Sequence, residues 1–390
     1  MRHEVKNGKL ILYPEGRIDS NTSAAFEAEI GELLSLDPGH NAEVNMEGVE
    51  YVSSAGLRCF LKLKKAGNDL EFSEMSQAVY EIFQMTGFTE LFKTKKALRR
   101  MSVDGCEVIG RGFYGTVYRV DEDTIVKVYE SPDSIPMIEN EQRRAKQAFL
   151  KGIPTAISYD AVKIGNSYGS VFEMLKARTF NDIIISDPDN ADETIKKYVD
   201  FLKLVHGTEM DQGSLPYASD VFMDYLDTVK HYLNDSQYEK LKTYLEKFPK
   251  DEHVVHGDFQ MKNVMLVEGE PMLIDMDTLS AGHPIFDLAG LYVTYKSFEE
   301  DEPDNSIKFL GITNEMCDRI WNGIMVHYFD DHTSEERTYI EDRIKLAAVL
   351  RFLYILDVTD LKNGELGMLR IKHSCEHIEE LLEKTDGLYF

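Results

Sequence analysis

Two short polar segments in the second half of the chain carry side chains that could hold a metal ion and move a proton. Asp258 ends the string HGD, and Asn263 stands five residues beyond it, whereas Asp275 ends the apolar string MLID. The intervening residues predict two strands joined by a turn, a hairpin that brings these three side chains to one end. Carboxylate and amide oxygens are ligands that Mg²⁺ accepts, which leaves Asp258 free to take a proton from an attacking hydroxyl.

A glycine-rich string earlier in the chain could hold phosphate. GRGFYGTV places Gly110, Gly112 and Gly115 at the G-x-G-x-x-G spacing and continues to Val117. A dinucleotide-binding fold uses the same spacing, but there a helix follows at once. Here TVYRV continues as a strand, turns, and returns as TIVKVY. A glycine hairpin is therefore predicted, in which backbone N–H groups can approach phosphate oxygens closely.

A lysine on the returning strand fits the same chemistry. Lys127 interrupts the apolar run TIVKVY, where a charged group is costly unless it is paired, so a phosphate and a carboxylate are its natural partners. The next predicted helix offers Glu139 and Glu141 as the carboxylate, and the position further into the helix favours Glu141. A surface lysine or a turn-forming aspartate would explain any one of these residues, but their combination and order favour a site for a magnesium-bound nucleotide.

Composition excludes several classes of protein. The 390 residues carry 43 Lys+Arg against 69 Asp+Glu, a formal charge of -26, so the basic surface of a nucleic-acid-binding protein is absent. Such a field repels ATP at long range and attracts a cationic acceptor. No apolar run approaches the ~20 residues of a membrane helix, and the first residues lack a secretion signal. We therefore expect a cytoplasmic protein that binds neither membrane nor nucleic acid.

Two different patterns of elements divide the chain. In residues 1–100, the strand-like strings KLILYPEG and AEVNMEGV alternate with the helical strings TSAAFEAEIGELLSL and AGLRCFLKLKK, which predicts a small α/β domain. The basic stretch Phe92–Arg100 is predicted to be a solvated connector, with docking on the acidic remainder of the chain as the alternative.

The second domain, residues 104–390, is β-rich at first and dominantly helical after about residue 190. This order predicts an α+β, bilobal domain with a small sheet-bearing lobe and a larger helical lobe, and a shared site in the cleft between them.

The strings GRGFYGTV, HGDFQMKN, IDMD and HPIFDLAG, together with Lys127, carry a family resemblance. Residues 104–390 resemble the aminoglycoside phosphotransferase and choline kinase branch of the protein-kinase-like fold. The resemblance implies lobes of about 104–178 and 179–390, ATP and Mg²⁺ as cofactors, Asp258 as the catalytic base, and Asn263 and Asp275 as the residues that hold the metal.

The same resemblance assigns further roles. Lys127 contacts the α- and β-phosphates, the hinge FEML meets adenine and supplies Glu173 and Leu175 to the nucleotide site, and Asp287 anchors the catalytic loop. HGD in place of H-R-D, IDMD in place of D-F-G, and no A-P-E string point to small-molecule acceptors. Lys262 would neutralise the transferring phosphoryl group, as lysine does in protein kinases, or be an exposed loop lysine.

Residues 1–100 resemble a STAS domain, the module of anti-sigma-factor antagonists, on the strings EGRIDSNTSAAFEAEI, VEYVSSAGLRCFLKL and VYEIFQMTGFTELF. The resemblance implies a regulatory or binding module with a protein partner. It also implies phosphorylation of the serine at the head of the second helix, which is Ser54 here, although Ser53 replaces the aspartate that precedes it in the family. The competing interpretation is that this serine caps the helix.

Together these observations predict an ATP- and Mg²⁺-dependent phosphotransferase with a STAS regulatory domain. It would move the γ-phosphoryl group to a hydroxyl of a small molecule, with cationic or amino-bearing acceptors favoured by the charge. Two alternatives stay open. One is a protein serine kinase that acts on its own STAS domain or on a partner, and the other is a non-catalytic nucleotide-binding scaffold, against which the intact set of site residues argues.

Overall fold

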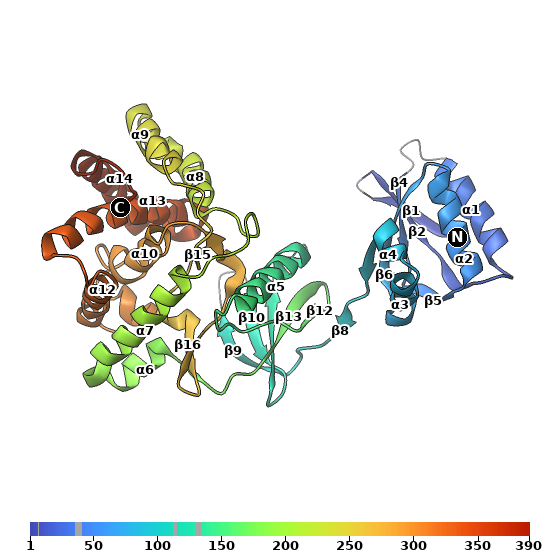
Figure 1. Ribbon diagram of the computed structural model, residues 1–390, viewed down its shortest axis with the longest axis horizontal. Helices are drawn as coiled ribbons and strands as arrows, with labels where there is room; N and C mark the ends of the chain where they lie inside the picture. Colours follow the sequence, from blue (N-terminus) through green and yellow to red (C-terminus); the bar gives the residue numbers. More distant parts are fainter. Residues whose placement is uncertain (7, 36–40, 112–114, 130, 132–133) are drawn as a thin grey trace. The chain divides into compact units, whose positions relative to one another are not determined.

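Strands and helices alternate along the first quarter of the chain and separate along the rest (Figure 1). The structure is a computed structural model that describes residues 1–6, 8–35, 41–111, 115–129, 131 and 134–390. The chain divides into two units, Met1–Ser102 with Val162–Gly165, and Val103–Ala161 with Asn166–Phe390. The predicted fold class, an α/β part followed by a bilobal α+β part, is confirmed.

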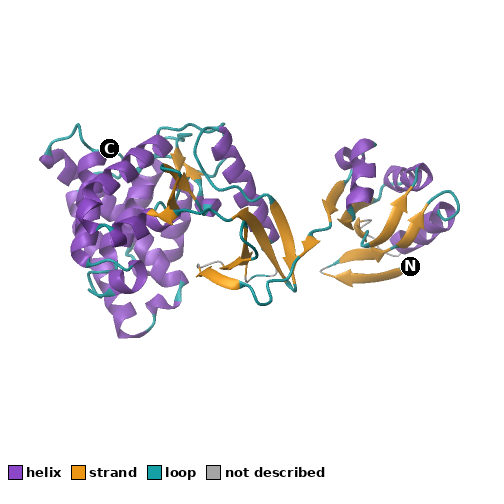
Figure 2. Cartoon of the chain, turned by 90° about the horizontal axis from the view of Figure 1, so that it is seen from below, coloured by secondary structure: helices purple, strands orange, loops and turns teal. Residues whose placement is uncertain are grey.

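The first unit is a sheet with helices against it (Figure 2). Its five-stranded sheet has the order β1-β2-β4-β6-β7, in which only β1 and β2 are antiparallel, and β3 and β5 form a separate parallel pair. The strands are β1 (Arg2–Lys6), β2 (Lys9–Tyr13), β3 (Glu15–Ile18), β4 (Asn41–Asn45), β5 (Gly48–Val52), β6 (Asp69–Met75) and β7 (Lys93–Lys96). The helices are α1 (Ser23–Ser35), α2 (Ser54–Lys65), α3 (Gln77–Met85) and α4 (Phe88–Leu91).

Aromatic side chains fill the core of this unit. Phe60 of α2 packs edge-on against Phe72 of β6 with ring centroids 4.7 Å apart, and both rings are fully buried. Alternation in β2 buries Leu10 and Leu12 and leaves Lys9, Ile11 and Tyr13 partly exposed. The buried faces of the strands, which repeat every second residue, therefore pack with the buried face of α2 in one hydrophobic layer.

The basic stretch after α4 differs from its prediction. Lys93–Lys96 forms β7, which pairs in parallel with β6, so the expectation of a solvated connector is wrong for these residues. Buried Phe92 fixes the entry to the strand, and Lys93 lies 3.1 Å from Glu71. Exposed lysines are typical of an edge strand, where they discourage pairing with another chain. The short strand β8 (Arg99–Arg100) follows.

The second unit begins with a small lobe. Its strands β13, β11, β10 and β9 lie side by side in that order, and each pairs antiparallel with the next. Val126 and Tyr129 of β11 are buried, and because they stand three positions apart they face opposite sides of the sheet. The elements are β9 (Glu107–Arg111), β10 (Gly115–Arg119), β11 (Thr124–Tyr129), α5 (Ile135–Leu150), β12 (Asp160–Ile164) and β13 (Ser167–Glu173).

The larger lobe of the second unit is a helical bundle around α13 (Ser334–Val358), which begins with a capping box between Thr333 and Glu336 and buries residues on most of its sides. The other helices are α6 (Phe180–Ser186), α7 (Ala191–His206), α8 (Ala218–Val229), α9 (Asp235–Glu246), α10 (Ile285–Tyr292), α11 (Asn305–Leu310), α12 (Asn314–Tyr328) and α14 (Gly364–Lys384).

Short elements of this lobe carry the polar segments. The strands are β14 (Arg178–Thr179), β15 (Val254–Val255), β16 (Val264–Val267), β17 (Glu270–Leu273) and β18 (Ser280–Ala281). The 3₁₀ turns are η1 (Pro188–Asn190), η2 (Lys230–Tyr232), η3 (Met261–Asn263), η4 (Met276–Thr278) and η6 (Asp360–Lys362), and α10 continues as a π-helical turn, η5 (Val293–Ser297).

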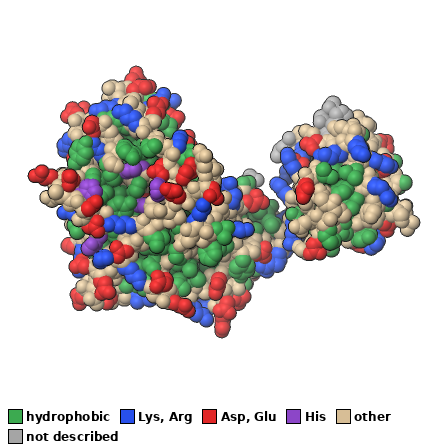
Figure 3. Space-filling model, in the orientation of Figure 1, with side chains coloured by type: hydrophobic (Ala, Val, Ile, Leu, Met, Phe, Trp, Pro, Cys, Tyr) green, Lys and Arg blue, Asp and Glu red, His purple; other side chains and the backbone are tan. Residues whose placement is uncertain are grey.

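Acidic side chains are spread over the visible face of the second unit, with basic ones between them (Figure 3). Within the described ranges, no helix combines the length and the apolar character that a membrane crossing needs.

Candidate active site

Lys127 is held between two carboxylates that come from opposite lobes of the second unit. It lies on β11 opposite Val117 of β10, and its side chain is only 14% exposed. Its Nζ contacts Asp275 and lies 3.6 Å from Oε1 of Glu141. Glu139 is exposed on the same helix, so the structure places Glu141 rather than Glu139 against the lysine.

Burial and charge set the protonation of this cluster. Burial opposes the charged form of Lys127, but the carboxylates of Glu141 and Asp275 outweigh it and raise the pKa of the lysine. Burial also raises the pKa of Glu141, which Lys127 counteracts. Burial and the neighbouring Asp275 raise the pKa of Asp277 to about 7. The cluster thus holds more acidic groups than a single lysine neutralises, which is the setting in which a bound cation is stabilised.

A second group of hydrogen bonds shapes the loop around Asp258. Asn263 donates its side-chain N–H groups to the backbone oxygen of Asp258 at 2.9 Å and to its Oδ2 at 2.7 Å. Gln260 donates to the same Oδ2 at 2.9 Å. In the described part of the chain no hydrogen bond reaches Oδ1 of Asp258, so this oxygen is available to accept a proton.

Asp287 ties this loop to α10. Its buried carboxylate accepts from the backbone N–H groups of His256 at 2.8 Å and Gly257 at 2.6 Å, and it lies 3.0 Å from Nε2 of His206. Burial opposes its ionisation, but His206 and the backbone donors outweigh burial and lower the pKa of Asp287. Gly257 adopts φ 86°, and a Cβ there would lie 2.8 Å from Thr278, so the loop requires glycine at this point.

The hairpin that was predicted to bring the polar residues together is present. Strands β16 and β17 pair, and N–H of Ile274 donates to the backbone oxygen of Asn263 at 3.0 Å. The second strand ends at Leu273 rather than at Asp275, which instead adopts a left-handed conformation with φ 64°. Such strain in a residue other than glycine is typical of functional sites, and here it turns the carboxylate toward Lys127.

The glycine string is described only in part. Gly110 lies in β9 and Gly115 in β10, whereas Gly112 lies outside the described residues. A Cβ on Gly115 would lie 2.1 Å from the backbone oxygen of Val128, so close pairing of β10 with β11 by itself requires this glycine. Gly110 has more room, because its nearest contact would be 3.8 Å away, to Val117.

The predicted hinge follows β13. Glu173 is the exposed last residue of that strand, and half-buried Leu175 lies in the connection to β14. N–H of Met174 donates to the backbone oxygen of Asp123 at 2.8 Å, which fixes the start of the connection.

Lys262 does not point at the loop carboxylate. Its Nζ donates to the backbone oxygen of Phe309 and lies 4.5 Å from the centre of the Phe309 ring, and burial lowers its pKa. Neither of its two predicted roles describes this placement, because the lysine is half-buried against α11.

Several residues near the site were missed from the sequence. Burial raises the pKa of Tyr225 of α8, an effect that Arg351 opposes and Asp258 reinforces. The Tyr225 ring stacks on Tyr354 with centroids 4.0 Å apart. Arg144 donates to the backbone oxygen of Asp277. The string IDMD drew attention to Asp277, but not to Arg144. Arg144 and Tyr225 lie on amphipathic helices, whose sequence does not show which face meets the site.

Ser54 is the exposed first residue of α2. The helix cap is Ser53, whose Oγ accepts from N–H of Ala55 at 3.1 Å. The interpretation of Ser54 as the capping residue is therefore wrong, because the helix starts at Ser54 itself, one residue earlier than that role requires.

The residues present fit a magnesium ion. Both side-chain hydrogen bonds that Asn263 makes to described residues use its nitrogen, so its Oδ1 can accept from or coordinate a ligand. Asp275 adds a carboxylate that is 39% exposed. Nowhere in the described ranges do three His, Cys, Asp or Glu side chains lie together as a metal site. A metal here would therefore take its remaining ligands from nucleotide phosphates and water, as Mg²⁺ usually does.

Comparison with known proteins relates both parts of the chain to families. A family model described as "Phosphotransferase enzyme family" matches residues 105–312, and a model of the STAS domain matches residues 1–101. The protein of Bordetella bronchiseptica named "Putative anti-sigma factor antagonist BtrV" is 31% identical over 91 residues, which cover 22% of this chain and 77% of that protein.

Solved structures resemble the chain more distantly. A thermostable mutant of aminoglycoside phosphotransferase APH(4)-Ia has a TM-score of 0.49 at 13% identity, covering 72% of this chain and 95% of that one. ADP-bound aminoglycoside phosphotransferase APH(2'')-Ib has a TM-score of 0.47 at 16% identity, with 73% and 94% covered. A choline/ethanolamine kinase family protein from Mesorhizobium loti has a TM-score of 0.46 at 15% identity, with 73% and 89% covered.

The two family matches confirm both resemblances that the motifs predicted, and with them the prediction that the chain is a phosphotransferase with a STAS domain.

Proposed function

The chain belongs to the phosphotransferase enzyme family, and from that premise we propose that it moves the γ-phosphoryl group of ATP to a hydroxyl of a small molecule in a Mg²⁺-dependent reaction. The observation that carries the proposal is the contact of Lys127 with Asp275, because it joins the glycine hairpin of the small lobe to the metal-ligand segment of the large lobe. Phosphoryl transfer needs mainly positioning and neutralisation of charge, which such a cluster supplies.

Each residue has a distinct task in this proposal. Asp258 accepts at Oδ1 the proton of the acceptor hydroxyl. The hydroxyl oxygen bonds to the γ-phosphorus as the bond between this phosphorus and the β–γ bridging oxygen breaks, which releases ADP. Lys127 binds the α- and β-phosphates and is oriented by Glu141. Asn263 and Asp275 would hold Mg²⁺, which when bound neutralises phosphate charge. Asp287 holds the loop that carries Asp258.

The rest of the nucleotide site follows from the small lobe. We propose that Gly110, Gly112, Gly115 and Val117 cover the phosphates and that the connection through Glu173 and Leu175 meets adenine. The domain boundaries of 1–100 and 104–390, and a cytoplasmic location, belong to the same proposal.

The net charge of -26 favours an acceptor that carries an amine as well as the hydroxyl. Tyr225 and Tyr354 would contact it, since Tyr225 lies within electrostatic reach of Asp258. Arg351 is the local exception to the acidic surroundings, so the amine would lie away from it.

A screen of hydroxylated amines, sugars and nucleosides for stimulated ADP release tests the proposal. We expect one acceptor class to stimulate release, and Asp258→Asn to lower turnover by ~10²-fold or more with nucleotide binding retained. Full turnover in Asp258→Asn would overturn the role of Asp258 as the base.

A second candidate is phosphorylation of a serine in a STAS domain, either its own or that of a protein partner. Exposure of Ser54 favours it, because the neighbouring Ser53 performs the capping and leaves the hydroxyl of Ser54 accessible. Label from ATP on the chain that disappears in Ser54→Ala would support this candidate, whereas acceptor-dependent ADP release without labelled protein would support the small-molecule reaction.

A further inference from the structure

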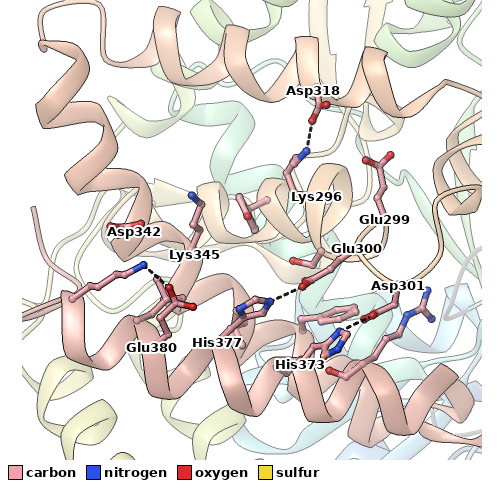
Figure 4. Close-up of a pocket in the computed structure, with 18 of the residues that line it drawn as sticks. Lys296, Glu299, Glu300, Asp301, Asp318, Asp342, Lys345, His373, His377 and Glu380 are labelled. Carbon is pink, nitrogen blue, oxygen red and sulfur yellow. Dashed lines mark hydrogen bonds and ion pairs between the residues drawn. The ribbon is translucent and has the colours of Figure 1, made fainter. Parts of the chain in front are cut away.

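A cavity of about 510 Å³ lies in the helical lobe, where residues of α10, η5, α12, α13 and α14 line it (Figure 4). Tyr292 and Lys296 line it from the turn where α10 continues as the π-helical η5. Tyr295 of the same turn points elsewhere, since its hydroxyl accepts from the N–H of Met261, just beyond Asp258. The cavity is therefore separate from the phosphotransfer site, but its wall includes the turn whose Tyr295 supports the loop around Asp258. π-Helical turns are frequent at functional sites.

Acidic side chains outnumber basic ones in the lining. The acidic residues are Glu299, Glu300, Asp301, Asp318, Asp342 and Glu380, and the basic residues are Lys296, Lys345, Arg370 and Lys384. Each basic group already contacts a carboxylate, in the pairs Lys296–Asp318, Lys345–Glu341, Arg370–Glu302 and Lys384–Glu380. The basic groups are thus neutralised, and an anion entering the cavity would have to displace a carboxylate from them.

The two histidines of the lining occupy two further carboxylates. His373 lies 2.7 Å from Asp301, and His377 lies 2.7 Å from Glu300. Both contacts join α14 to the segment that follows η5, and both appear in Figure 4.

Glu299 and Asp342 remain without an ion pair to any described residue. Glu299 is the more informative, because it is only 8% exposed and its Oε1 has no hydrogen-bond partner in the described part of the chain. Burial, and after it the neighbouring Glu299, raise the pKa of the Cys317 thiol. An unsatisfied carboxylate oxygen in a buried position is costly, and native proteins rarely leave one without a ligand or water.

Apolar groups complete the wall. Tyr292, Val349, Phe352 and Leu381 line the same cavity, which offers contact area for an aliphatic chain. Figure 4 shows Glu299 and Asp342 on opposite sides of the view, with Lys345 and His377 between them. No metal-binding group of three His, Cys, Asp or Glu side chains occurs among the residues described, so an organic cation suits the lining better than a metal ion.

We propose that this cavity is a binding site for an aliphatic amine cation of the diamine or polyamine class, with Glu299 as its buried anionic contact and Asp342 as a second one. The ammonium group pairs with the carboxylate of Glu299, and the methylene chain packs on Tyr292 and Phe352. A cavity of this size is large enough for such a molecule.

Isothermal titration calorimetry of spermidine with the full chain, without nucleotide, measures the Kd that tests the proposal. We expect saturable binding, at least tenfold weaker in Glu299→Gln, which keeps the shape and removes the charge. Glu239→Gln on α9 removes the same charge away from the cavity and is expected to leave the Kd within twofold. Asp342→Asn provides a second variant, expected to weaken binding at least threefold even if Glu299→Gln does not fold.

Four results would overturn the proposal. The first is no saturable binding of spermidine, and the second is equal affinity in wild type, Glu299→Gln and Asp342→Asn. The third is loss of binding in Asp258→Asn instead, which would place spermidine at the phosphotransfer site. Competition by inorganic phosphate would likewise identify an anion site and contradict the amine class.

Discussion

Replacement of Asp287 by asparagine is expected to destabilise the second unit strongly. The carboxylate accepts from two backbone N–H groups and faces His206, and it is fully buried. An asparagine side chain has one acceptor oxygen, and its NH₂ group would face one of the same donors. Hydrogen bonds to a charged group contribute about 1.5–3 kcal/mol each, and a buried donor left unpaired costs about 1–3 kcal/mol. We therefore expect Asp287→Asn to lower the free energy of unfolding by about 3–5 kcal/mol.

Urea unfolding followed by tryptophan fluorescence measures this loss. The chain has a single tryptophan, Trp321 in α12, so its fluorescence reports the second unit rather than the STAS domain. Asp220→Asn is the matched control, because Asp220 forms an exposed ion pair with Lys250 at 2.5 Å, and loss of such a pair costs less than about 1 kcal/mol. If Asp287→Asn were as stable as Asp220→Asn, the buried carboxylate would not be what holds the catalytic loop.

Two further predictions address the small lobe and the pH dependence. Glu141→Gln should weaken nucleotide binding about tenfold, which corresponds to about 1.4 kcal/mol, because Lys127 loses one of its two carboxylates. Glu139→Gln on the same helix should leave the dissociation constant of the nucleotide unchanged. Equal dissociation constants for the two variants would contradict the pairing of Lys127 with Glu141. Burial lowers the pKa of His283 from 6.5 to about 4, and the ring is neutral because Nδ1 accepts from N–H of Ile285 while Nε2 faces the backbone oxygen of Phe390. As the pH falls, the unfolded chain binds a proton at this residue before the folded chain does. The contribution of His283 to the free energy of unfolding is therefore fully present above pH 6.5 and is lost, by up to about 3 kcal/mol, as the pH falls through about 4. His283→Gln should remove that part of the decline in urea unfolding measured across this pH range, and an unchanged pH profile would rule out His283 as its source.

The sequence predicted those features of the fold and site that local patterns determine. Period-2 and helical spacing located the alternating elements of the first unit and the glycine hairpin of the second. Lys127 was identified because a charge inside an apolar strand needs a partner, and the structure gives it Glu141 and Asp275. Strings in which residue type and spacing both matter therefore carried most of the functional information.

Tertiary contacts decided what sequence patterns left open. Basic composition suggested a connector at Lys93–Lys96, but pairing with β6 makes it a strand, and composition does not reveal pairing partners. Lys262 was expected near phosphate or in solvent, yet packing against Phe309 places it elsewhere. The capping residue is Ser53 rather than Ser54 because the helix begins one residue earlier than a cap at Ser54 requires. Tyr225 and Arg351 come close to each other only through the packing of α8 against α13.

The measurement that most directly tests the central claim is the dissociation constant of ATP, determined with and without Mg²⁺ for the wild type and for Asp275→Ala. If Lys127, Asn263 and Asp275 belong to one magnesium-nucleotide site, Mg²⁺ should tighten ATP binding to the wild type, and Asp275→Ala should lose this gain by about tenfold or more. Asp258→Asn should keep it, because Asp258 acts on the acceptor. The same magnesium dependence in Asp275→Ala as in the wild type would contradict the claim.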